Sequence, residues 1–427
     1  MKKIISLFCL VLAFANNSCT DMDDNLEVAR LQDVIIKDSE MYNLIERVTT
    51  DSDNPLEDIV CIDFVYPLEV KLYNADLVRT DSVILLGDDE FSAFLGSLTP
   101  SQALSISYPI ITTFSDGDTF TINNNDELKV VIDQCSREDL VSYCNSVFSS
   151  NDGISDCVWK VQYLSEKDNK YVGGTFLVNP DNTLVFHYDG EDYDGNWIFL
   201  FVNDEFHINI NLEGTSQVAA DWNIDRKMIF TGTTIEIVNS PESTMLVRTC
   251  QETDAYEPGD AGPAGGIVFY DKGEYSHGWR YMEAAPQDLD AFEWGCASAL
   301  IGNSNAAIGS GLVNSAKIVN YHDNLTNYYL NPAVCNAANN GTVAAQKAIT
   351  LTAGGQIDWF LPSEDELILM YENLYLEGLG NFTPQPYWSA TEIDAQNAQT
   401  IDFATGNATS SLKIPTIPVK TRAVRYF

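Results

Sequence analysis

Basic residues and histidines are scarce in this sequence. Its 427 residues include 62 Asp and Glu but only 23 Lys and Arg, which gives a formal net charge of -39, and there are four histidines. A field of this sign repels phosphate backbones, so we exclude nucleic acid as a partner. No run of basic residues is longer than two, which also argues against polyanionic glycans. The acidic charge itself is typical of a highly soluble surface.

The sequence also lacks the short motifs of common catalytic sites. It contains no HExxH, no CxxC and no Gly-x-Ser-x-Gly. The glycine-rich segment 258–266 is followed by neither Gly-Lys-Ser/Thr nor a predicted helix, so it is not a phosphate loop. Abundant carboxylates do not define a glycosidase pair, because that chemistry depends on their separation. We therefore predict that the protein is not an enzyme and needs no catalytic cofactor.

Long apolar runs are absent, and the longest lies near the start. Lys2 and Lys3 precede the apolar residues 4–15, a stretch too short to span a bilayer and typical of a secretory signal. Ser18-Cys19 follows and resembles the bacterial lipobox, and the acidic residues 20–24 resemble the export signal of Bacteroidota-type surface lipoproteins. The resemblance implies a signal peptide at 1–18, a lipid on Cys19 and a place on the outer-membrane surface. Ordinary signal-peptidase cleavage nearby is the alternative.

Seven cysteines remain once Cys9 leaves with the signal and Cys19 takes lipid. Their spacing suits no zinc site, and in an oxidising compartment they are expected to form disulfides. Sequence does not fix the connectivity. If each bridge closes one domain, the pairs are Cys61–Cys135, Cys157–Cys250 and Cys296–Cys335, which leaves Cys144 unpaired.

The first half of the mature chain is predicted to hold two domains after a lipidated tether and linker at 19–58. Residues 59–148 contain a degenerate repeat, marked by Tyr66-Pro67 and Tyr108-Pro109, which predicts strand, strand and helix twice over. The two Tyr-Pro pairs suggest edge strands, because proline cannot donate to a sheet. Residues 155–250 contain about eight short alternating runs separated by turns, which predicts a small β-barrel. Trp159, 195–197 and 248–250 resemble motifs of lipocalin-like lipoprotein domains.

The C-terminal part, 251–427, carries an ordered set of aromatic motifs. These are 256–270, 278–286, 294–296, 359–367, 387–392 and 422–427. In this order they resemble the C-terminal domain of collagen-like bacterial adhesins (the Lcl C-terminal family), which is similar to C-type lectins. The resemblance implies an α+β lectin-like domain. Independently, Ser363 and Glu366 form a capping box that starts a helix at 364–374, and alternation around Arg422 and Arg425 indicates a closing strand.

The long polar segment 297–355 is where we expect ligand contacts, because exposed loops rich in Tyr and Asn suit glycan or protein surfaces. The candidate binding residues are Asn320, Tyr321, His322, Asn324, Tyr328, Tyr329, Trp388 and Glu392. The ligand sets of calcium-dependent lectins are absent. Acidic residues that could hold calcium instead are Asp288, Asp290, Glu293, Glu392 and Asp394.

Together these features predict a mainly β, multidomain surface lipoprotein. We expect a non-catalytic adhesin or glycan- or protein-binding protein that acts through its lectin-like domain. Two alternatives stay open. One is an accessory outer-membrane lipoprotein of a transport complex, and the other is a carrier of a small apolar ligand inside the barrel.

Overall fold

A computed structural model describes residues 29, 34–50, 59, 61–114, 119–149, 157–203, 205–239, 241–251 and 253–427, without the side chains of residues 114 and 134–136. The predicted signal peptide, Cys19 and most of the tether lie outside these residues. The chain divides into two compact units, residues 1–139 and 140–427. We expected separate domains at 155–250 and 251–427, and both lie in the second unit.

The first unit contains two small antiparallel sheets. One has the strand order β1-β5-β3-β4 and the other the order β2-β6-β7. The strands are β1 (Ile35–Ile36), β2 (Ile62–Phe64), β3 (Leu68–Tyr73), β4 (Arg79–Leu85), β5 (Ala103–Ile106), β6 (Ile110–Phe114) and β7 (Thr119–Ile122). The helices are α1 (Glu40–Val48), α2 (Asp88–Ser97) and α3 (Asn125–Ser149), and the unit boundary falls within α3.

The order strand, strand, helix occurs twice in this unit, as β3-β4-α2 and β6-β7-α3. Tyr66 donates a hydrogen bond to Asp88 in the first copy, and Tyr108 donates one to Asn125 in the second. The prediction that the Tyr-Pro pairs mark edge strands is wrong, because β3 and β6 each lie between two neighbours in their sheets. Each proline precedes the first residue of its strand, where no ladder hydrogen bond is lost.

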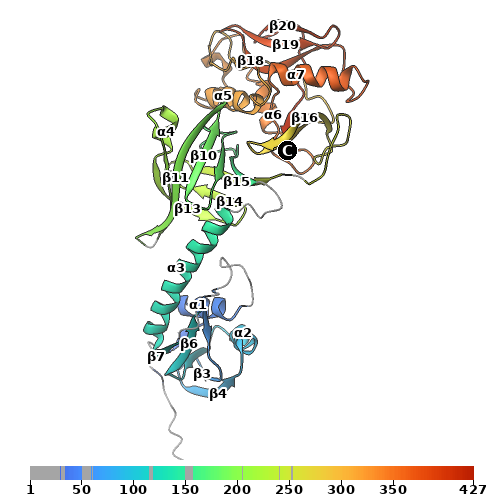
Figure 1. The fold of residues 1–427 in the computed structure, drawn as a ribbon. Helices are drawn as coiled ribbons and strands as arrows, with labels where there is room; N and C mark the ends of the chain where they lie inside the picture. The colour runs from blue at the N-terminus through green and yellow to red at the C-terminus, as the bar shows by residue number, and fades with distance from the viewer. Residues whose placement is uncertain are drawn as a thin grey trace, which may run out of the picture. The chain divides into compact units, whose positions relative to one another are not determined.

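The second unit begins with a closed eight-stranded barrel, which confirms the predicted barrel and the mainly β character (Figure 1). Its strand order is β10-β11-β12-β13-β14-β15-β8-β9. The strands are β8 (Cys157–Val161), β9 (Thr175–Val178), β10 (Thr183–Tyr188), β11 (Glu191–Val202), β12 (Glu205–Leu212), β13 (Ile224–Phe230), β14 (Thr234–Ile237) and β15 (Thr244–Cys250), with the short helix α4 (Gln217–Asp221) before β13.

Aromatic side chains fill the barrel. Phe148, at the end of α3, lies 4.8 Å from Trp197 and 5.3 Å from Trp159 between ring centroids. The indole of Trp159 also donates a 2.9 Å hydrogen bond to the carbonyl of Phe148. A second cluster contains Phe176, Phe186 and Trp222. Such rings bury a large apolar area, so they form the core of the barrel.

The rest of the second unit contains two three-stranded sheets and three α-helices. The sheets are β16 (Ile267–Ser276), β17 (Trp279–Ala284) and β21 (Val424–Tyr426), and β18 (Pro386–Glu392), β19 (Asn397–Asp402) and β20 (Asn407–Leu412). The helices are α5 (Gly311–Asp323), α6 (Ala344–Ile349) and α7 (Glu364–Met370). Helices α5 and α7 pack against the sheet of β18 (Figure 1).

Two expectations for this region differ from the structure. Segment 297–355 is not one long loop, because it contains α5 and α6. Arg422 and Arg425 were expected to alternate with the buried Ala423 and Val424 and so to point outward, but they do not. Both are buried, since Arg422 pairs with Asp288 and Arg425 pairs with Glu283 and Asp358. The capping box of Ser363 and Glu366 is present at the start of α7 as predicted.

Candidate functional site

The candidate binding residues of segment 320–329 cluster around the C-terminal end of α5, and they differ in exposure. Tyr321 and Tyr329 are half-buried and Asn324 is exposed. Asn320 donates a 2.8 Å hydrogen bond to the carbonyl of Asn169 and so ties α5 to the barrel. These four side chains are the members of the set that a ligand could reach.

His322 and Tyr328 are buried. The amide of Cys296 donates a 2.8 Å hydrogen bond to His322 Nε2, and His322 Nδ1 donates to the carbonyl of Ile318 at 2.6 Å. Burial lowers the pKa of His322 to about 4, so the imidazole is neutral near pH 7. Both ring nitrogens are occupied, which gives His322 a place in the core.

Trp388 and Glu392 lie on β18 and are also buried. The indole of Trp388 donates to the carbonyl of Phe292 at 3.0 Å. Glu392 accepts hydrogen bonds from the amides of Ile301 and Gly302 and pairs with the buried Lys413 at 2.5 Å. Contact of either side chain with a ligand requires a conformational change.

The carboxylates proposed for calcium have protein partners where the structure shows them. Asp288 binds Arg422 and accepts a hydrogen bond from Tyr387, and Glu293 accepts one from the Asn339 amide. Asp394 accepts hydrogen bonds from Asn397, which lower its pKa. Asp290 is exposed.

Two of the expected disulfides are present among the described cysteines. Cys157–Cys250 closes the barrel between β8 and β15, and Cys296–Cys335 joins the segments before and after α5. Cys61 is disulfide-bonded, and the side chain of its expected partner Cys135 lies outside the described residues. Cys144 is a buried free thiol, and burial raises its pKa to about 12.

A cleft of about 270 Å³ lies between the barrel and the C-terminal part of the second unit. We call it the cleft from here on. Most of the lining comes from the barrel around β8 to β10, from the β16–β17 hairpin, and from the loop into α5 with the first turn of that helix. Strand β21 contributes Tyr426. The residues with polar or aromatic side chains are Lys160, Thr175, His187, Asp189, Lys272, Ser276, His277, Trp279, Asn305, Ser310 and Tyr426.

The barrel contributes a buried lysine to the cleft. Lys160, on β8, is 7% exposed, and its ammonium lies 3.8 Å from the carboxylate of Asp358. Burial lowers the pKa of Lys160, and Asp358 partly opposes that effect. Asp358 also pairs with Arg425, which in turn pairs with Glu283, so Lys160 belongs to a buried network of two basic and two acidic side chains.

The β16–β17 turn brings a second lysine and an aromatic ring. Gly278 has φ +80°, and a Cβ there would lie 2.8 Å from Val158 Cγ2, so only glycine allows this turn to pack closely on the barrel. Trp279 stacks on Tyr426 with ring centroids 4.6 Å apart, and Lys272 Nζ lies 3.8 Å from the Trp279 ring. Burial lowers the pKa of Lys272 to about 8.

The third wall is held in place by a buried carboxylate. Glu366 accepts hydrogen bonds from the amides of Gly309 and Ser363 at 2.8 Å and from the hydroxyl of Tyr426. A Cβ on Gly311 would lie 2.2 Å from Glu366 Oε2. The capping box that the sequence revealed therefore also positions the loop that lines the cleft.

This arrangement suits a small polar ligand with a negative charge. Lys272 supplies positive charge, Lys160 supplies a second amino group, and Ser276, Asn305 and Ser310 supply hydroxyl and amide groups. Sequence reasoning missed this site, because its lysines are far apart in the chain. The pattern Ser276-His277-Gly278-Trp279 was the one local signal that could have pointed to it.

A scan of protein-family models finds none that matches the chain, and a search of curated proteins finds no relative. Among the helices that the structure describes, none combines the length and apolar character needed to cross a membrane.

Proposed function

We propose that this chain is a non-catalytic binding protein of the bacterial outer-membrane surface, anchored through a lipid on Cys19. Its C-terminal part is proposed to be a lectin-like domain of the Lcl C-terminal kind, and the barrel to be lipocalin-like. The ligand is proposed to be a glycan that carries a carboxylate on its terminal sugar.

The observation that carries this proposal is that two lysines line the same cleft of a strongly acidic chain. Lys160 is buried and Lys272 is half-buried. A field from -39 charges repels an anion everywhere except where cations are concentrated and shielded from water. The cleft volume of about 270 Å³ lies just below the roughly 300–1,000 Å³ that is usual for small-molecule sites, which suits a single sugar residue. The neutral hydrogen-bonding groups beside the lysines suit sugar hydroxyls.

Binding of the full secreted chain to a glycan array, followed by calorimetry with carboxylated and neutral sugars, tests the proposal. We expect carboxylated glycans to bind and Lys272→Met to weaken that binding about tenfold, since one charge-assisted hydrogen bond is lost. Lys227→Met is the matched control, because Lys227 pairs with Glu205 on the barrel and does not line the cleft. No binding, or equal loss in both variants, would contradict the proposal.

The anchor needs a separate experiment. Radiolabelled palmitate should label the wild-type chain and not a Cys19→Ser variant, and the variant should leave the membrane fraction. A wild-type chain that takes no label overturns the anchor and leaves the cleft proposal standing. Recovery of the chain in a stable transporter complex would instead favour the accessory lipoprotein, and a lipid co-purified in native mass spectrometry would favour the barrel carrier.

A further inference from the structure

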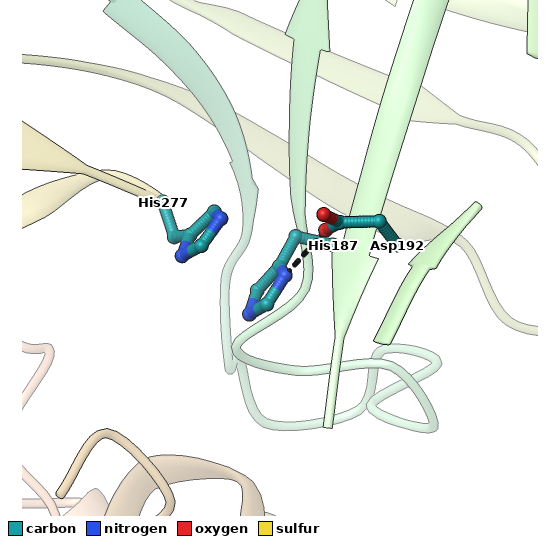
Figure 2. Close-up of side chains that lie close together, drawn as sticks. All are labelled: His187, Asp192 and His277. Atoms are coloured by element: carbon teal, nitrogen blue, oxygen red, sulfur yellow. Dashed lines mark hydrogen bonds and ion pairs between the residues drawn. The ribbon is translucent and has the colours of Figure 1, made fainter. Parts of the chain in front are cut away.

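Three side chains with metal-binding atoms meet at the edge of the cleft. They are His187 on β10, Asp192 on β11 and His277 in the β16–β17 turn (Figure 2). Their ligand atoms all lie within 4.8 Å of one another, and no other such group occurs among the described residues. The three come from two parts of the second unit, the barrel and the C-terminal part.

The barrel fixes His187 and Asp192 relative to each other. They are direct partners in the β10–β11 ladder, and His187 Nδ1 lies 2.6 Å from Asp192 Oδ1. His187 Nδ1 and the Asp192 carboxylate therefore face each other, and both can ligate one ion that displaces the proton between them.

The β16–β17 turn places His277 against a face of the His187 ring, whereas Asp192 contacts the edge of that ring at Nδ1. The two imidazole rings are stacked, with centroids 3.6 Å apart and planes 5° from parallel (Figure 2). His277 has φ +51°, a left-handed conformation that is uncommon outside glycine and is held here by the close packing of Gly278 on the barrel. The backbone is thus constrained to place a second imidazole beside the first.

From this geometry we infer that His187, Asp192 and His277 bind a divalent transition ion of the Zn²⁺ class. Two imidazoles and a carboxylate are a donor set that Zn²⁺ accepts, whereas Ca²⁺ and Mg²⁺ prefer oxygen alone. A metal lies in the plane of the ring that it ligates, so the stacked rings turn about their Cβ–Cγ bonds to share one ion. His277 is exposed and has room to do so.

An ion bound here would join the barrel to the β16–β17 turn. Three protein ligands leave one position of a tetrahedral Zn²⁺ site open to water or to a ligand in the cleft. The inference does not rest on the proposed glycan, because the donor set is defined by protein atoms alone.

Zinc titration of the full secreted chain by calorimetry tests the inference, with excess Mg²⁺ present to occupy scattered carboxylates. We expect one saturable site. His187→Asn, Asp192→Asn and His277→Asn should each weaken zinc binding tenfold or more, because each removes one of the three protein ligands. Circular dichroism confirms that each variant is folded.

The barrel offers a matched control in His207. Its Nδ1 lies 2.7 Å from Asp225, so it repeats the His–Asp pair of His187, but it belongs to no three-residue metal group in the described chain. His207→Asn should leave zinc affinity unchanged. Substituted Co²⁺ should give the visible absorption of a tetrahedral site in the wild type and lose it in His277→Asn. Absence of a saturable site, or an equal loss in His207→Asn, overturns the inference.

Discussion

Two buried ion pairs lie in the C-terminal part. Lys413 and Glu392 are almost fully buried and lie 2.5 Å apart, and Arg425 lies 2.8 Å from Glu283. Burial lowers the pKa of Lys413, while Glu392 opposes that effect. Removing one partner leaves an uncompensated charge in the core, which is more costly than removing both.

Glu392→Gln should therefore destabilise the protein by about 3–5 kcal/mol. The double variant Glu392→Gln/Lys413→Met should recover part of that loss, because the buried ammonium is removed with its partner. Guanidinium unfolding of the two variants and the wild type measures both effects. A single variant as stable as the wild type would show that the pair is solvated in solution.

His322 should make stability depend on pH. Its pKa falls to about 4 in the folded state, against about 6.5 in an unfolded chain. Between these values the unfolded state binds a proton that the folded state does not, so stability is lost as the pH falls. From about pH 7.5 to about pH 5 we expect a loss of about 2 kcal/mol from this residue.

Denaturant unfolding at several pH values measures that loss. His322→Gln should reduce the decline by the same amount, although its stability at neutral pH will also be lower because the Cys296 amide loses its acceptor. An unchanged pH dependence in the variant would contradict the buried neutral imidazole.

At the scale of elements, the two described disulfides close loops of different length. The cysteines of Cys157–Cys250 are separated by 93 residues, and those of Cys296–Cys335 by 39. Replacing either pair with alanine should cost about 2–4 kcal/mol. The loss should be larger for Cys157–Cys250 by about 0.8 kcal/mol, because the longer loop restricts the unfolded chain more. Calorimetric unfolding of both double variants compares them, and the reverse order would show that strand pairing outweighs loop closure.

The α7 capping box links helix stability to the cleft. Glu366 accepts hydrogen bonds from four donors, and glutamine would bring an NH₂ group against them. Glu366→Gln should cost about 1–3 kcal/mol and weaken ligand binding in the cleft, because the 309–311 wall loses its anchor. Glu372→Gln is the control, since Glu372 is exposed in the π-helical turn Tyr371–Tyr375 that follows α7. Thermal melts and sugar titrations report the two effects separately, and unchanged binding in Glu366→Gln would mean that the wall is held by other contacts.

The whole molecule contains two units with separate cores. The first has its own cluster of buried residues, which includes Ile45, Val70 and Phe91, and the second is built around the barrel and the C-terminal sheets. We predict two transitions in scanning calorimetry. Zinc should raise only the transition of the second unit, because a ligand stabilises the unit that binds it. A single transition, or a rise in the temperatures of both transitions on adding zinc, would contradict the separation into two units.

Sequence alone determined the features that depend on neighbouring residues. Alternation of apolar residues located the eight barrel strands, and Ser363 with Glu366 located the start of α7, because side-chain period and capping act within a few residues. The sequence left the disulfide connectivity open, and the structure bears out the pairing of Cys157 with Cys250 that was expected if each bridge closes one domain. The C-terminal resemblance and the lipid anchor remain predictions.

The tertiary structure decided which side chains are buried and which distant residues lie close together. His322, Tyr328 and Trp388 looked like exposed recognition residues, yet packing placed them in the core. The cleft joins Lys160, His187 and Lys272 across more than a hundred residues of chain, and these side chains matter only as a group. Residues 276–279 gave a local signal for one wall only. The group forms when the β16–β17 turn packs on the barrel, and that contact depends on shape complementarity between distant segments.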